Sequence, residues 1–574
     1  MDLGRDTIWE QQLDDPITVD VIAQALDLDV HVGRILVQRG IRTAKDAKSF
    51  IQPVLEQLHN PLLLPDASIA IDRLLAAIEK GERIAIHGDY DVDGVTATVL
   101  IRRVFELMGA DVSHYIPHRM SDGYGLTIDG INRLHNEGAK VVVTVDCGIR
   151  SLEAAERARE IGVDLLVTDH HEPGDVLPRA VAVINPRRND SKYPCRDLSG
   201  AGIAFKIAQA LCIRTGNTKW LSALLKIAAI GTVADVVPLV GENRVIASLG
   251  LDALTAGGHT HGLQALLDVS GLDGRRVESE DISFRLAPRI NAAGRMSSAG
   301  LAADLLLSAG TSSVTECRAL AEHLDELNTM RREQERQATN TACDAIDAEA
   351  MATKRPCHVV WSNEWHRGVI GIIASRLVER FRRPAIVISV EGDQAYGSGR
   401  SIPGFDLLGA LNDCEGVLTQ YGGHRHAVGL RLQSASIPEF RSQFERSVGT
   451  RLVVGDCVPK LTVDSVIDFA AITAKFVRDL QLLEPFGSGN PRPVFVASGV
   501  EIVDGPHLVK SEHLRMTLGQ AGKRFQAVAW RAGSQIADFN SRRNGLKIAF
   551  TVAENTYKDK TTTQLTIAGV KEDD

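Results

Sequence analysis

Three short apolar runs in this chain each lead into acidic or imidazole side chains, and this pattern constrains the fold more than any other feature. The side chains that follow the runs R-I-A-I, V-V-V-T-V and L-L-V-T are, in chain order, His87, Asp89, Asp91 and Asp93, then Asp146, then Asp169, His170 and His171. In an open parallel sheet the carboxyl ends of the strands meet at one edge, where such folds bind their ligands. Carboxylates and imidazoles gathered there repel one another unless cations lie between them. The pattern therefore predicts bound divalent metal and metal-assisted attack on a phosphate.

The first acidic run has two other interpretations. D-Y-D-V-D-G fits the opening of an EF-hand calcium loop, but the twelfth position from Asp89 is Leu100 instead of a bidentate Glu. The segment before it is also apolar, unlike a helix with one polar face. The run D-V-D-G-V is similar to the nucleophile loop of haloacid-dehalogenase phosphatases, whose first Asp is phosphorylated, but that interpretation leaves His170 and His171 unexplained. A merely solvated acidic turn would not recur at two further strand ends.

Composition places the chain among globular proteins. Its 574 residues suggest three or four domains, because single cores rarely exceed ~250–300 residues. Eight cysteines without a C-x-x-C pair argue against a zinc site and against a disulfide framework. The polar N-terminus predicts no secretion signal, and no run approaches ~18 apolar residues, so we expect a cytoplasmic protein with no membrane contact.

The net charge of −9 is unusual for a protein that binds nucleic acid, since such proteins are usually basic over the contacting face. Several of the acids, however, belong to the predicted metal site, where divalent cations reverse the local charge. Basic residues also cluster in two runs, 285–295 and 380–383. A narrow positive groove on an acidic protein is compatible with this distribution.

Five segments follow from the pattern of elements. They are a helical leader at 1–65, an α/β domain at 66–310, a connecting helix at 311–355, a second α/β domain at 356–457 and a β domain at 458–574. Strands and helical segments alternate in the first α/β domain, as in βαβ units. Residues 311–355 contain neither Gly nor Pro and have apolar residues at helical spacing. One unbroken helix there would extend roughly 65 Å as a strut; the alternative is two packed helices with a turn.

The last two segments differ in pattern. The second α/β domain begins with H-V-V-W and continues with an apolar run at 385–390 and a glycine pair at 397 and 399. From about 458 the pattern becomes short strands with period-two alternation, which are Phe495–Ala497, Leu514–Leu518, Phe525–Trp530, Ile548–Val552 and Gln564–Ala568. Five such strands are typical of a small barrel of the OB type, a common platform for single strands.

These motifs resemble those of a known superfamily. H-G-D-Y-D-V-D-G, V-D-C-G and T-D-H-H-E-P are similar to the first three motifs of the DHH phosphoesterases, and A-I-G-T-V-A-D-V-V-P-L (229–239) to the fourth, with Asp235 as its acid. The runs at 285–296, 421–429 and 483–495 narrow the resemblance to the RecJ family, exonucleases specific for single-stranded DNA. The resemblance covers nearly the whole chain in the right order. It implies an α/β protein with a parallel-sheet DHH domain and a second α/β DHH-associated domain joined by a long helix, plus a C-terminal OB-type β-barrel.

The resemblance also implies a set of metal ligands. Two divalent cations, Mg²⁺ or Mn²⁺, can together activate the nucleophile, stabilise the leaving oxyanion and neutralise the phosphate. Asp146, alone at its strand end, is positioned to bridge them. The superfamily pattern implies that one cation is held by His87, Asp91 and Asp146, and the other by Asp93, Asp146, His170 and Asp235. Asp89 is either a further ligand or an outer partner of the site.

Other side chains are expected to act on the substrate. By resemblance, His171 faces the scissile phosphate as a hydrogen-bond donor or proton source, and Asp169 orients the site from behind. The substrate contacts that the resemblance implies are Arg119, Arg289, Asn291, Arg295, Gly423 and His424, whereas His426 lies off the motif. G-S-G-R-S offers Ser398, Gly399, Arg400 and Ser401 as a phosphate pocket with exposed backbone amides. The alternative for that run is an ordinary glycine turn.

The function implied by the resemblance is hydrolysis of single-stranded DNA from the 5′ end with release of 5′-mononucleotides. Polarity and product come from the resemblance alone. The expected partners are single-stranded DNA, a helicase and a single-strand binding protein, and the expected state is a monomer. Two alternatives remain: a DHH phosphoesterase acting on nanoRNA, a cyclic dinucleotide or pyrophosphate, and a metal-stabilised single-strand binding factor without catalysis. The long helix and the barrel would be surplus for a small substrate, and a binding factor has no use for the full set of acids and imidazoles.

Overall fold

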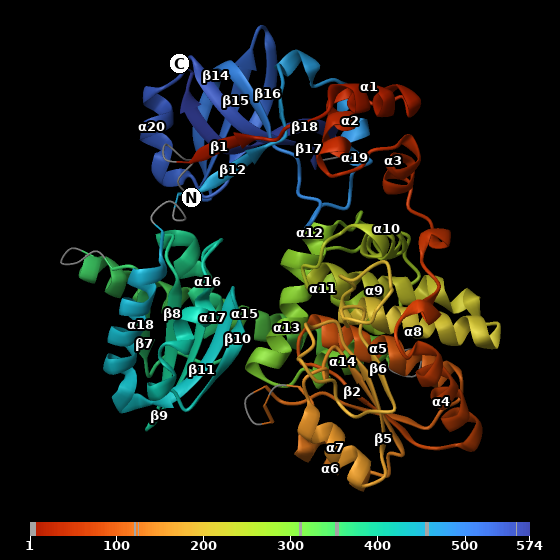
Figure 1. The fold of residues 1–574 in the computed structure, drawn as a ribbon. Coiled ribbons are helices and arrows are strands. Elements are labelled where there is room, and N and C mark those ends of the chain that lie inside the picture. The colour runs from red at the N-terminus through yellow and green to blue at the C-terminus, as the bar shows by residue number, and fades with distance from the viewer. Residues whose placement is uncertain are drawn as a thin grey trace. The chain divides into compact units, whose positions relative to one another are not determined.

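The computed structural model describes residues 7–119, 122–123, 125–308, 313–350, 355–453, 458–557 and 560–573. The chain forms two compact units (Figure 1). The first unit consists of Ser49–Arg331 with Leu483–Pro491, and the second of Met1–Lys48, Arg332–Leu482 and Arg492–Asp574. The units are therefore not consecutive in sequence, because the short segment 483–491 packs with the first unit while its flanking residues belong to the second.

The first unit is built on a five-stranded sheet in the order β3-β2-β4-β5-β6, in which every neighbouring pair of strands is parallel. The strands are β2 (Ile84–His87), β3 (Val112–Tyr115), β4 (Val141–Val145), β5 (Asp164–Thr168) and β6 (Ala182–Ile184). Every residue of β2 and β4 is buried, as expected of parallel strands covered on both faces. The runs identified in the sequence are thus the central strands of the predicted parallel sheet.

Helices cover both faces of this sheet. Ile84 and Ile86 share a core with residues of α4 (Ala67–Lys80) and α5 (Val92–Leu107). Ala85, between them, packs instead with α6 (Ile128–Asn136) and α7 (Leu152–Glu160). Because successive strand residues point to opposite faces, this division defines three layers, helix, sheet and helix. The carboxyl edge of the sheet is left open between the layers for the side chains that follow each strand.

The rest of the first unit is helical, so the expected alternation of strands and helices ends at residue 184 instead of near 310. The remaining helices are α8 (Gly200–Thr215), α9 (Leu221–Ala234), α10 (Gly241–Thr255), α11 (His261–Val269), α12 (Ser279–Asp281), a π-helix at Ile282–Leu286, α13 (Ala287–Met296) and α14 (Gly300–Leu307). Helices α8 and α9 are buried nearly all round. Their apolar runs are too long for strands and are typical of helices enclosed in a core.

One long helix continues from the first unit into the second. Helix α15 (Val314–Ala350) has 37 residues, or about 55 Å of length. Its first half contributes Cys317 and Leu324 to the core of the first unit, and its second half contributes Ala342 and Ile346 to a core of the second unit. The prediction of one long helix is confirmed, and the alternative of two helices with a turn is wrong.

The second unit contains a five-stranded mixed sheet in the order β10-β11-β9-β8-β7. Its elements are β7 (His358–Ser362), α16 (Ile370–Phe381), β8 (Ala385–Glu391), β9 (Gln394–Arg400), α17 (Leu407–Asn412), β10 (Gln420–His424), β11 (Ala427–Gln433) and α18 (Ile437–Arg451). Only β7 and β8 are parallel, and the other neighbouring pairs are antiparallel. This is the second α/β domain expected from the sequence.

The C-terminal strands form a closed barrel. The barrel strands are β14 (Phe495–Val509), β15 (His513–Gln520), β16 (Lys523–Ala529), β17 (Leu546–Tyr557) and β18 (Lys560–Glu572), and helices α19 (Ala474–Gln481) and α20 (Ile536–Ser541) lie in the same part of the chain. Strand β13 (Ser465–Val466) pairs with β14 outside the closed ring, and β12 (Lys460–Val463) lies in a separate two-stranded sheet. The sheet runs β14-β15-β16-β18-β17, and pairing of β14 with β17 closes it. The five strands predicted after residue 458 correspond to β14 to β18, and only Trp530 lies outside, directly after β16, so the OB-type barrel is confirmed.

The N-terminal segment is not purely helical. Strand β1 (Ile8–Gln11) pairs in parallel with β12 and is followed by α1 (Pro16–Ala25), α2 (Val30–Gln38) and α3 (Ala44–Ile51). The backbone amide of Asp29 donates to Asp479 on α19 at 2.8 Å. Residues 7–48 thus belong to the second unit together with the C-terminal strands, while the domain boundaries expected from the sequence stay predictions. None of the helices in the described part of the chain is long and apolar enough to span a lipid bilayer.

Candidate metal centre

The side chains predicted to bind metal gather at the carboxyl edge of the parallel sheet. Among the described residues, three groups have ligand atoms within 4.8 Å of one another: Asp89 with Asp91 and Asp146, Asp93 with His170 and Asp235, and Asp146 with His170 and His171. Asp146 follows β4, the histidines follow β5, and Asp235 is the C-cap of α9. His170 and Asp146 each occur in two groups, so the groups form one continuous cluster.

The turn after β2 presents its acids because α5 begins inside it. Asp91 is the N-cap of α5, and its side chain accepts a hydrogen bond from the amide of Gly94 at 3.1 Å. A Cβ atom at position 94 would lie 2.5 Å from the carbonyl oxygen of Asp89, so the turn requires glycine there. The tight turn thus brings Asp89, Asp91 and Asp93 to the same edge of the sheet.

Asp93 is held by the first turn of another helix. Its two carboxylate oxygens accept the backbone amides of Gly200 at 2.6 Å and Ala201 at 2.8 Å. The N-terminus of α8 therefore stabilises the negative charge of this acid. A Cβ atom at Gly200 would lie 2.6 Å from Cβ of Asp146, and one at Gly231 would lie 2.9 Å from Oδ1 of Asp93. The sequence analysis missed these two glycines, which let α8 and α9 approach the metal ligands.

Asp146 has an unusual backbone conformation, with φ of 61°. Few residues other than glycine adopt the left-handed region, and Asp is one of the more tolerant. Such strain is concentrated at functional sites, where the surrounding structure enforces it. Here it turns the carboxylate toward His170, whose Nε2 lies 3.1 Å from Oδ1 of Asp146.

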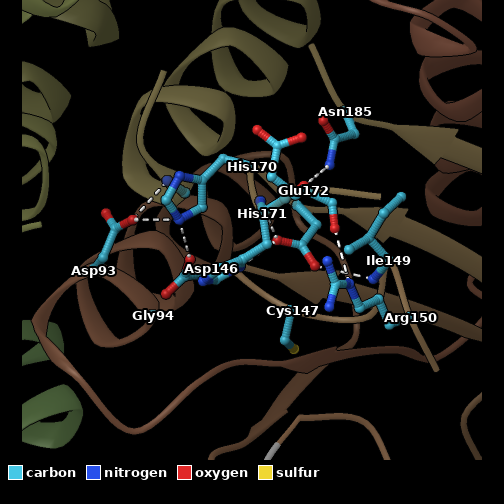
Figure 2. A network of polar contacts seen from close by, with 12 residues as sticks. Asp93, Gly94, Asp146, Cys147, Ile149, Arg150, His170, His171, Glu172 and Asn185 are labelled. Carbon is cyan, nitrogen blue, oxygen red and sulfur yellow. Dashed lines mark hydrogen bonds and ion pairs between the residues drawn. The ribbon is translucent and has the colours of Figure 1, made fainter. Parts of the chain in front are cut away.

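His170 lies among three acids (Figure 2). Its Nε2 atom is 3.1 Å from Asp146, 3.7 Å from Asp235 and 3.9 Å from Asp93, and Figure 2 shows the ring between Asp93 and Asp146. Burial lowers the pKa of His170 to about 3, so its ring is neutral. Nε2 of His170, Oδ1 of Asp146 and Oδ2 of Asp235 are buried without a hydrogen-bond partner. Buried acceptor atoms that face one another without hydrogen-bond partners destabilise the fold when no cation is bound. Their arrangement is suited to a cation placed between them.

The electrostatics of the acids agree with this fit. Burial, reinforced by neighbouring carboxylates, raises the pKa of Asp89 to about 8, that of Asp93 to about 7 and that of Asp235 to about 9. The same causes raise the pKa of Asp146 well above its usual range. A bound divalent cation stabilises the charged form of each acid and so displaces the protons.

His87 is placed differently from the other predicted ligands. It is buried at the end of β2, burial lowers its pKa to about 4, and Sγ of Cys147 lies 3.6 Å from its Nδ1. It belongs to none of the three groups found among the described residues, while Asp89 does. The assignment of His87 as a ligand stays a prediction, and the geometry favours a ligand role for Asp89 over an outer one.

Asp169 and His171 form a pair beside the cluster. Nδ1 of His171 lies 2.7 Å from Oδ1 of Asp169, which also accepts the His171 amide, while Oδ2 accepts the amide of Ile149 at 2.9 Å. Burial opposes a charge on either group, but their mutual hydrogen bond lowers the pKa of Asp169 and raises that of His171. The His171 side chain is 43% exposed. Its other ring nitrogen is thus free to face a substrate.

The loop that carries His171 has further support that the sequence analysis missed. Asn185, fully buried just after β6, donates from Nδ2 to the carbonyl of His171 at 2.8 Å. The guanidinium of Arg150 donates to the carbonyl of Glu172 at 2.9 Å, and Figure 2 shows these bonds around the loop. The only signal for Asn185 in the sequence is its position after an apolar strand, as for the metal ligands.

The predicted substrate contacts of the first unit lie on several elements. The guanidinium of Arg119 lies 4.9 Å from the centroid of the Tyr90 ring, in the acidic turn. Arg289 is largely engaged within the fold, since it donates to the carbonyl of Arg285 at 2.7 Å and pairs with Asp325 at 2.8 Å. Arg289, Asn291 and Arg295 all lie on α13. Their roles toward a substrate stay predictions.

The first four residues of the G-S-G-R-S run, 397–400, form the end of strand β9 (Gln394–Arg400), and the run is not a turn. Because β9 pairs with β8 and β11, its backbone amides are not exposed, and that part of the prediction is wrong. Cβ atoms at Gly397 and Gly399 would lie 2.6 Å from Leu430 and 2.5 Å from Ile386, so both glycines face a packed core. Alternation along the strand then places Ser398 and Arg400 on its other face.

Arg400 and its neighbours have defined partners in the second unit. The guanidinium of Arg400 donates to the carbonyl of Gly399 at 2.8 Å and to Oγ of Ser398 at 3.3 Å. Ser401 follows the strand and donates from Oγ to the carbonyl of Phe405 at 2.9 Å. Gly423 and His424 lie on β10, where Gly423 has φ of 139° and no room for a Cβ atom. Of this group, Ser398 and Arg400 offer the donors suited to a phosphate.

Comparisons with known proteins agree with the motifs. The family models that match are the DHH family, N-terminal domain, at residues 83–232, the DHHA1 domain at 354–450 and the RecJ OB domain at 463–569. The chain is 35% identical over 528 residues to the single-stranded-DNA-specific exonuclease RecJ of Bacillus subtilis, a match that covers 92% of this chain and 66% of that protein. It is 32% identical over 558 residues to the Escherichia coli RecJ, covering 94% of this chain and 95% of that protein.

The solved structures give the same result. The crystal structure of RecJ from Thermus thermophilus in complex with Mn²⁺ matches with a TM-score of 0.84 and 30% identity, covering 99% of this chain and 80% of that one. The structure of the Thermus protein with Mg²⁺ matches with a TM-score of 0.78 and 27% identity, covering 99% and 79%. The order of DHH, DHHA1 and OB domains, the metal centre at the sheet edge and these matches agree. The chain therefore belongs to the RecJ family of single-stranded-DNA-specific exonucleases.

Proposed function

We propose that this chain is a metal-dependent exonuclease that hydrolyses single-stranded DNA from the 5′ end and releases 5′-mononucleotides. One observation carries the proposal. Asp146, Asp235 and His170 present buried acceptor atoms without hydrogen-bond partners at the edge of a DHH-type sheet, in a chain with the domain order of the RecJ family. Acceptors so arranged are suited to divalent cations.

The ligand sets follow from the motifs and the geometry. His87, Asp91 and Asp146 hold one cation, with Asp89 close enough to contribute, and Asp93, Asp146, His170 and Asp235 hold the other. Asp146 serves both, which its place in two of the three ligand groups supports. The Thermus relative has been crystallised with Mn²⁺ and with Mg²⁺, and we propose that either ion serves here. When bound, two such cations activate a water, polarise the phosphate and stabilise the leaving oxyanion.

Of the remaining residues of the site, Asp169 positions His171, and His171 donates to the substrate. Asp169 holds Nδ1 of His171, so Nε2 of that ring is directed toward the substrate. From there His171 donates a hydrogen bond to the phosphate as charge develops on it, or a proton to the leaving oxygen. The pair follows the carboxylate–histidine arrangement that fixes the tautomer and orientation of an imidazole.

Binding of the DNA end is divided between the domains. In the DHH domain the DNA end is contacted by Arg119, Asn291 and Arg295, and Arg289 stabilises α13. In the DHHA1 domain the terminal phosphate is bound by Ser398 and Arg400. Gly399, Ser401, Gly423 and His424 shape that surface. The barrel holds the trailing strand by base stacking and backbone contacts. A helicase and a single-strand binding protein supply the substrate, and the enzyme acts as a cytoplasmic monomer.

An oligonucleotide assay tests the proposal. Single-stranded DNA labelled separately at its 5′ or 3′ end is digested with Mn²⁺, with Mg²⁺ or with EDTA. We expect the 5′ label to be released at once as a mononucleotide, the 3′ label to remain on progressively shorter strands, and EDTA to stop both. Mononucleotide released first from the 3′ end contradicts the proposed polarity. Cleavage confined to dinucleotides would instead identify a small-substrate phosphoesterase, and binding without cleavage a single-strand binding factor.

A further inference from the structure

The segment Leu483–Pro491 packs against the turn that follows the proposed ligand Asp235. Asp235 is the C-cap of α9, and the chain then runs through residues 236–240 before α10 begins at Gly241. In this turn the backbone amide of Leu239 donates to the carbonyl of Ser488 at 2.7 Å. The contact joins a segment of the sequence beyond residue 480 to the backbone four residues after Asp235.

The turn is strained at the residue next to Asp235. Val236 has φ of 61°, a conformation in which a β-branched side chain is a genuine outlier. Its side chain is 67% exposed, so burial of Val236 does not stabilise this conformation. A strained backbone persists only where the surrounding structure enforces it. The Val236 amide donates to the carbonyl of Val233 at 3.3 Å, and the residues after Val236 are restrained as well.

The turn at 236–240 is restrained on one side by residues of the DHH domain and on the other by the segment Leu483–Pro491. Asn243 donates from Nδ2 to the carbonyl of Pro238 at 3.1 Å, and the side chain of Leu239 is buried. On the other side lie Gly487 and Gly489. A Cβ atom at Gly487 would be 2.7 Å from Cδ1 of Leu239, and one at Gly489 would be 2.9 Å from Cβ of Pro238. Gly487 and Gly489 thus fit against the turn only because they have no Cβ atom.

Arg244 holds the segment in place. This buried guanidinium donates to the carbonyl of Leu483 at 3.0 Å and to that of Glu484 at 2.7 Å. Ser279 donates to the carbonyl of Phe486 at 2.6 Å, and Asn490 closes the segment by donating to Leu483 at 2.8 Å. The segment is therefore held by side chains of the DHH domain as well as by one of its own.

We propose that Leu483–Pro491 is a positioning clasp that holds Asp235 in its metal-binding position by fixing residues 236–240. The inference rests on the proposed function, since it takes Asp235 as a ligand. Gly487 and Gly489 are positioning residues and touch no reacting atom. Because the clasp is continuous in sequence with α19 before it and β14 after it, both in the second unit, a segment of the barrel region is needed to complete the metal site of the DHH domain.

The test compares two glycines that have the same backbone conformation. Gly489 has φ of 69° and Gly499 has φ of 65°, but a Cβ atom at Gly499 meets nothing within 4 Å. Gly489→Ala and Gly499→Ala in the full-length protein therefore carry the same conformational cost, and only the first pushes on Pro238. Mn²⁺ binding is measured by calorimetric titration, and hydrogen exchange of the Leu239 amide reports on the turn.

We expect Gly489→Ala to weaken the affinity for the more weakly bound Mn²⁺ by roughly ten- to a hundredfold, as loss of a residue supporting a ligand typically does. The Leu239 amide should exchange faster, and Gly499→Ala should match wild type in both measurements. High Mn²⁺ should restore DNA hydrolysis by Gly489→Ala. Gly487→Ala repeats the test at a glycine whose φ is not positive. Its control is Gly416→Ala, at a position where a Cβ atom would meet nothing within 4 Å and φ is likewise not positive.

The outcomes distinguish failure of the clasp hypothesis from failure of the proposed function. Wild-type affinity and exchange in both Gly489→Ala and Gly487→Ala, with wild-type protein binding Mn²⁺ normally, would overturn the clasp and leave the proposed function standing. Equal losses in a variant and its control would also overturn it, because the effect would then not depend on the contact between the segment and residues 236–240. Wild-type protein that binds no Mn²⁺ would overturn both.

Discussion

The Nε2 atom of His170 and the Oδ1 atom of Asp146 lie 3.1 Å apart, and neither has a hydrogen-bond partner. The ring comes from the end of β5 and the carboxylate from the neighbouring strand β4. Since burial keeps His170 neutral, an ion pair does not explain the approach. In the proposed function a cation is bound by both atoms, and this one relationship then connects the fold to the chemistry.

The stability of the metal-free protein should fall as pH rises. The folded-state pKa values of Asp93 (about 7) and Asp235 (about 9) exceed the value of about 3.9 for an unfolded Asp. Below about pH 4 the two carboxyl groups are protonated in the folded and in the unfolded protein, so they do not lower the free energy of unfolding. Between that pH and the folded-state values, the unfolded chain releases protons that the folded protein keeps, so stability is lost.

Thermal unfolding in EDTA between pH 5 and pH 9 checks this prediction. We expect the midpoint to decrease over that range, and saturating Mn²⁺ to remove most of the decrease by replacing the protons. Asp235→Asn, which lacks one of the titrating groups, should show a shallower decrease in EDTA than wild type. A midpoint in EDTA that rises with pH would contradict the electrostatic description. So would an Asp235→Asn variant whose midpoint decreases with pH as steeply as that of wild type.

The Asp169–His171 pair predicts a shift in the pH–rate profile. Asp169 raises the pKa of His171 through their hydrogen bond, so removing its charge should lower that pKa. If protonated His171 donates in the reaction, the alkaline limb of kcat should move to lower pH in Asp169→Asn. The control is Asp164→Asn, an acid at the start of β5 that pairs with Arg73. An unchanged alkaline limb in Asp169→Asn would exclude His171 as the donor.

The phosphate-binding role of Arg400 predicts a substrate-dependent loss. A charge-assisted hydrogen bond contributes on the order of 1.5–3 kcal/mol, or roughly ten- to a hundredfold in affinity. Arg400→Ala should therefore weaken binding of 5′-phosphorylated DNA strongly and that of 5′-hydroxyl DNA only slightly. Arg446→Ala, which removes the same charge from α18 of this domain, serves as the control. An equal ratio between the two substrates in wild type and Arg400→Ala would place the pocket elsewhere.

The strand-end acids could be predicted from sequence because each follows an apolar run directly. Asp146 and His170 come from a pattern that repeats along the chain, and parallel topology brings such ends together. Asp235 follows a helix, where nothing local marks it, and only the resemblance identified it. Gly200 and Gly231 matter for the approach of helices to the site, which depends on tertiary contacts that no local pattern encodes.

Other features of the fold also depend on distant pairing. Strand β1 exists because β12, some 450 residues later, offers it a partner, so its four residues carry no strong signal of their own. The G-S-G-R-S run was expected to be a phosphate pocket with exposed backbone amides, with an ordinary glycine turn as the alternative. In β9 the same glycines are required by packing against Leu430 and Ile386, and only the neighbouring strands reveal this.

A buried ion pair in the DHH domain predicts a large loss of stability. Lys206 is fully buried, and its Nζ lies 2.8 Å from Glu242 and 2.6 Å from the carbonyl of His59. Lys206→Met leaves the Glu242 charge buried without its partner, which typically costs about 3–5 kcal/mol. Lys226→Met, at a half-buried lysine on the next helix, should cost much less. Urea unfolding measures both, and a loss below about 1 kcal/mol for Lys206→Met would contradict the assignment.

The central claim is that one carboxylate serves both cations, and Asp146→Asn tests it most directly. A neutral amide cannot offset two divalent charges held close together. The variant should stay folded, bind less Mn²⁺ in a calorimetric titration, and leave end-labelled single-stranded DNA intact in either Mg²⁺ or Mn²⁺. Substantial release of mononucleotides by folded Asp146→Asn in either metal would contradict the account.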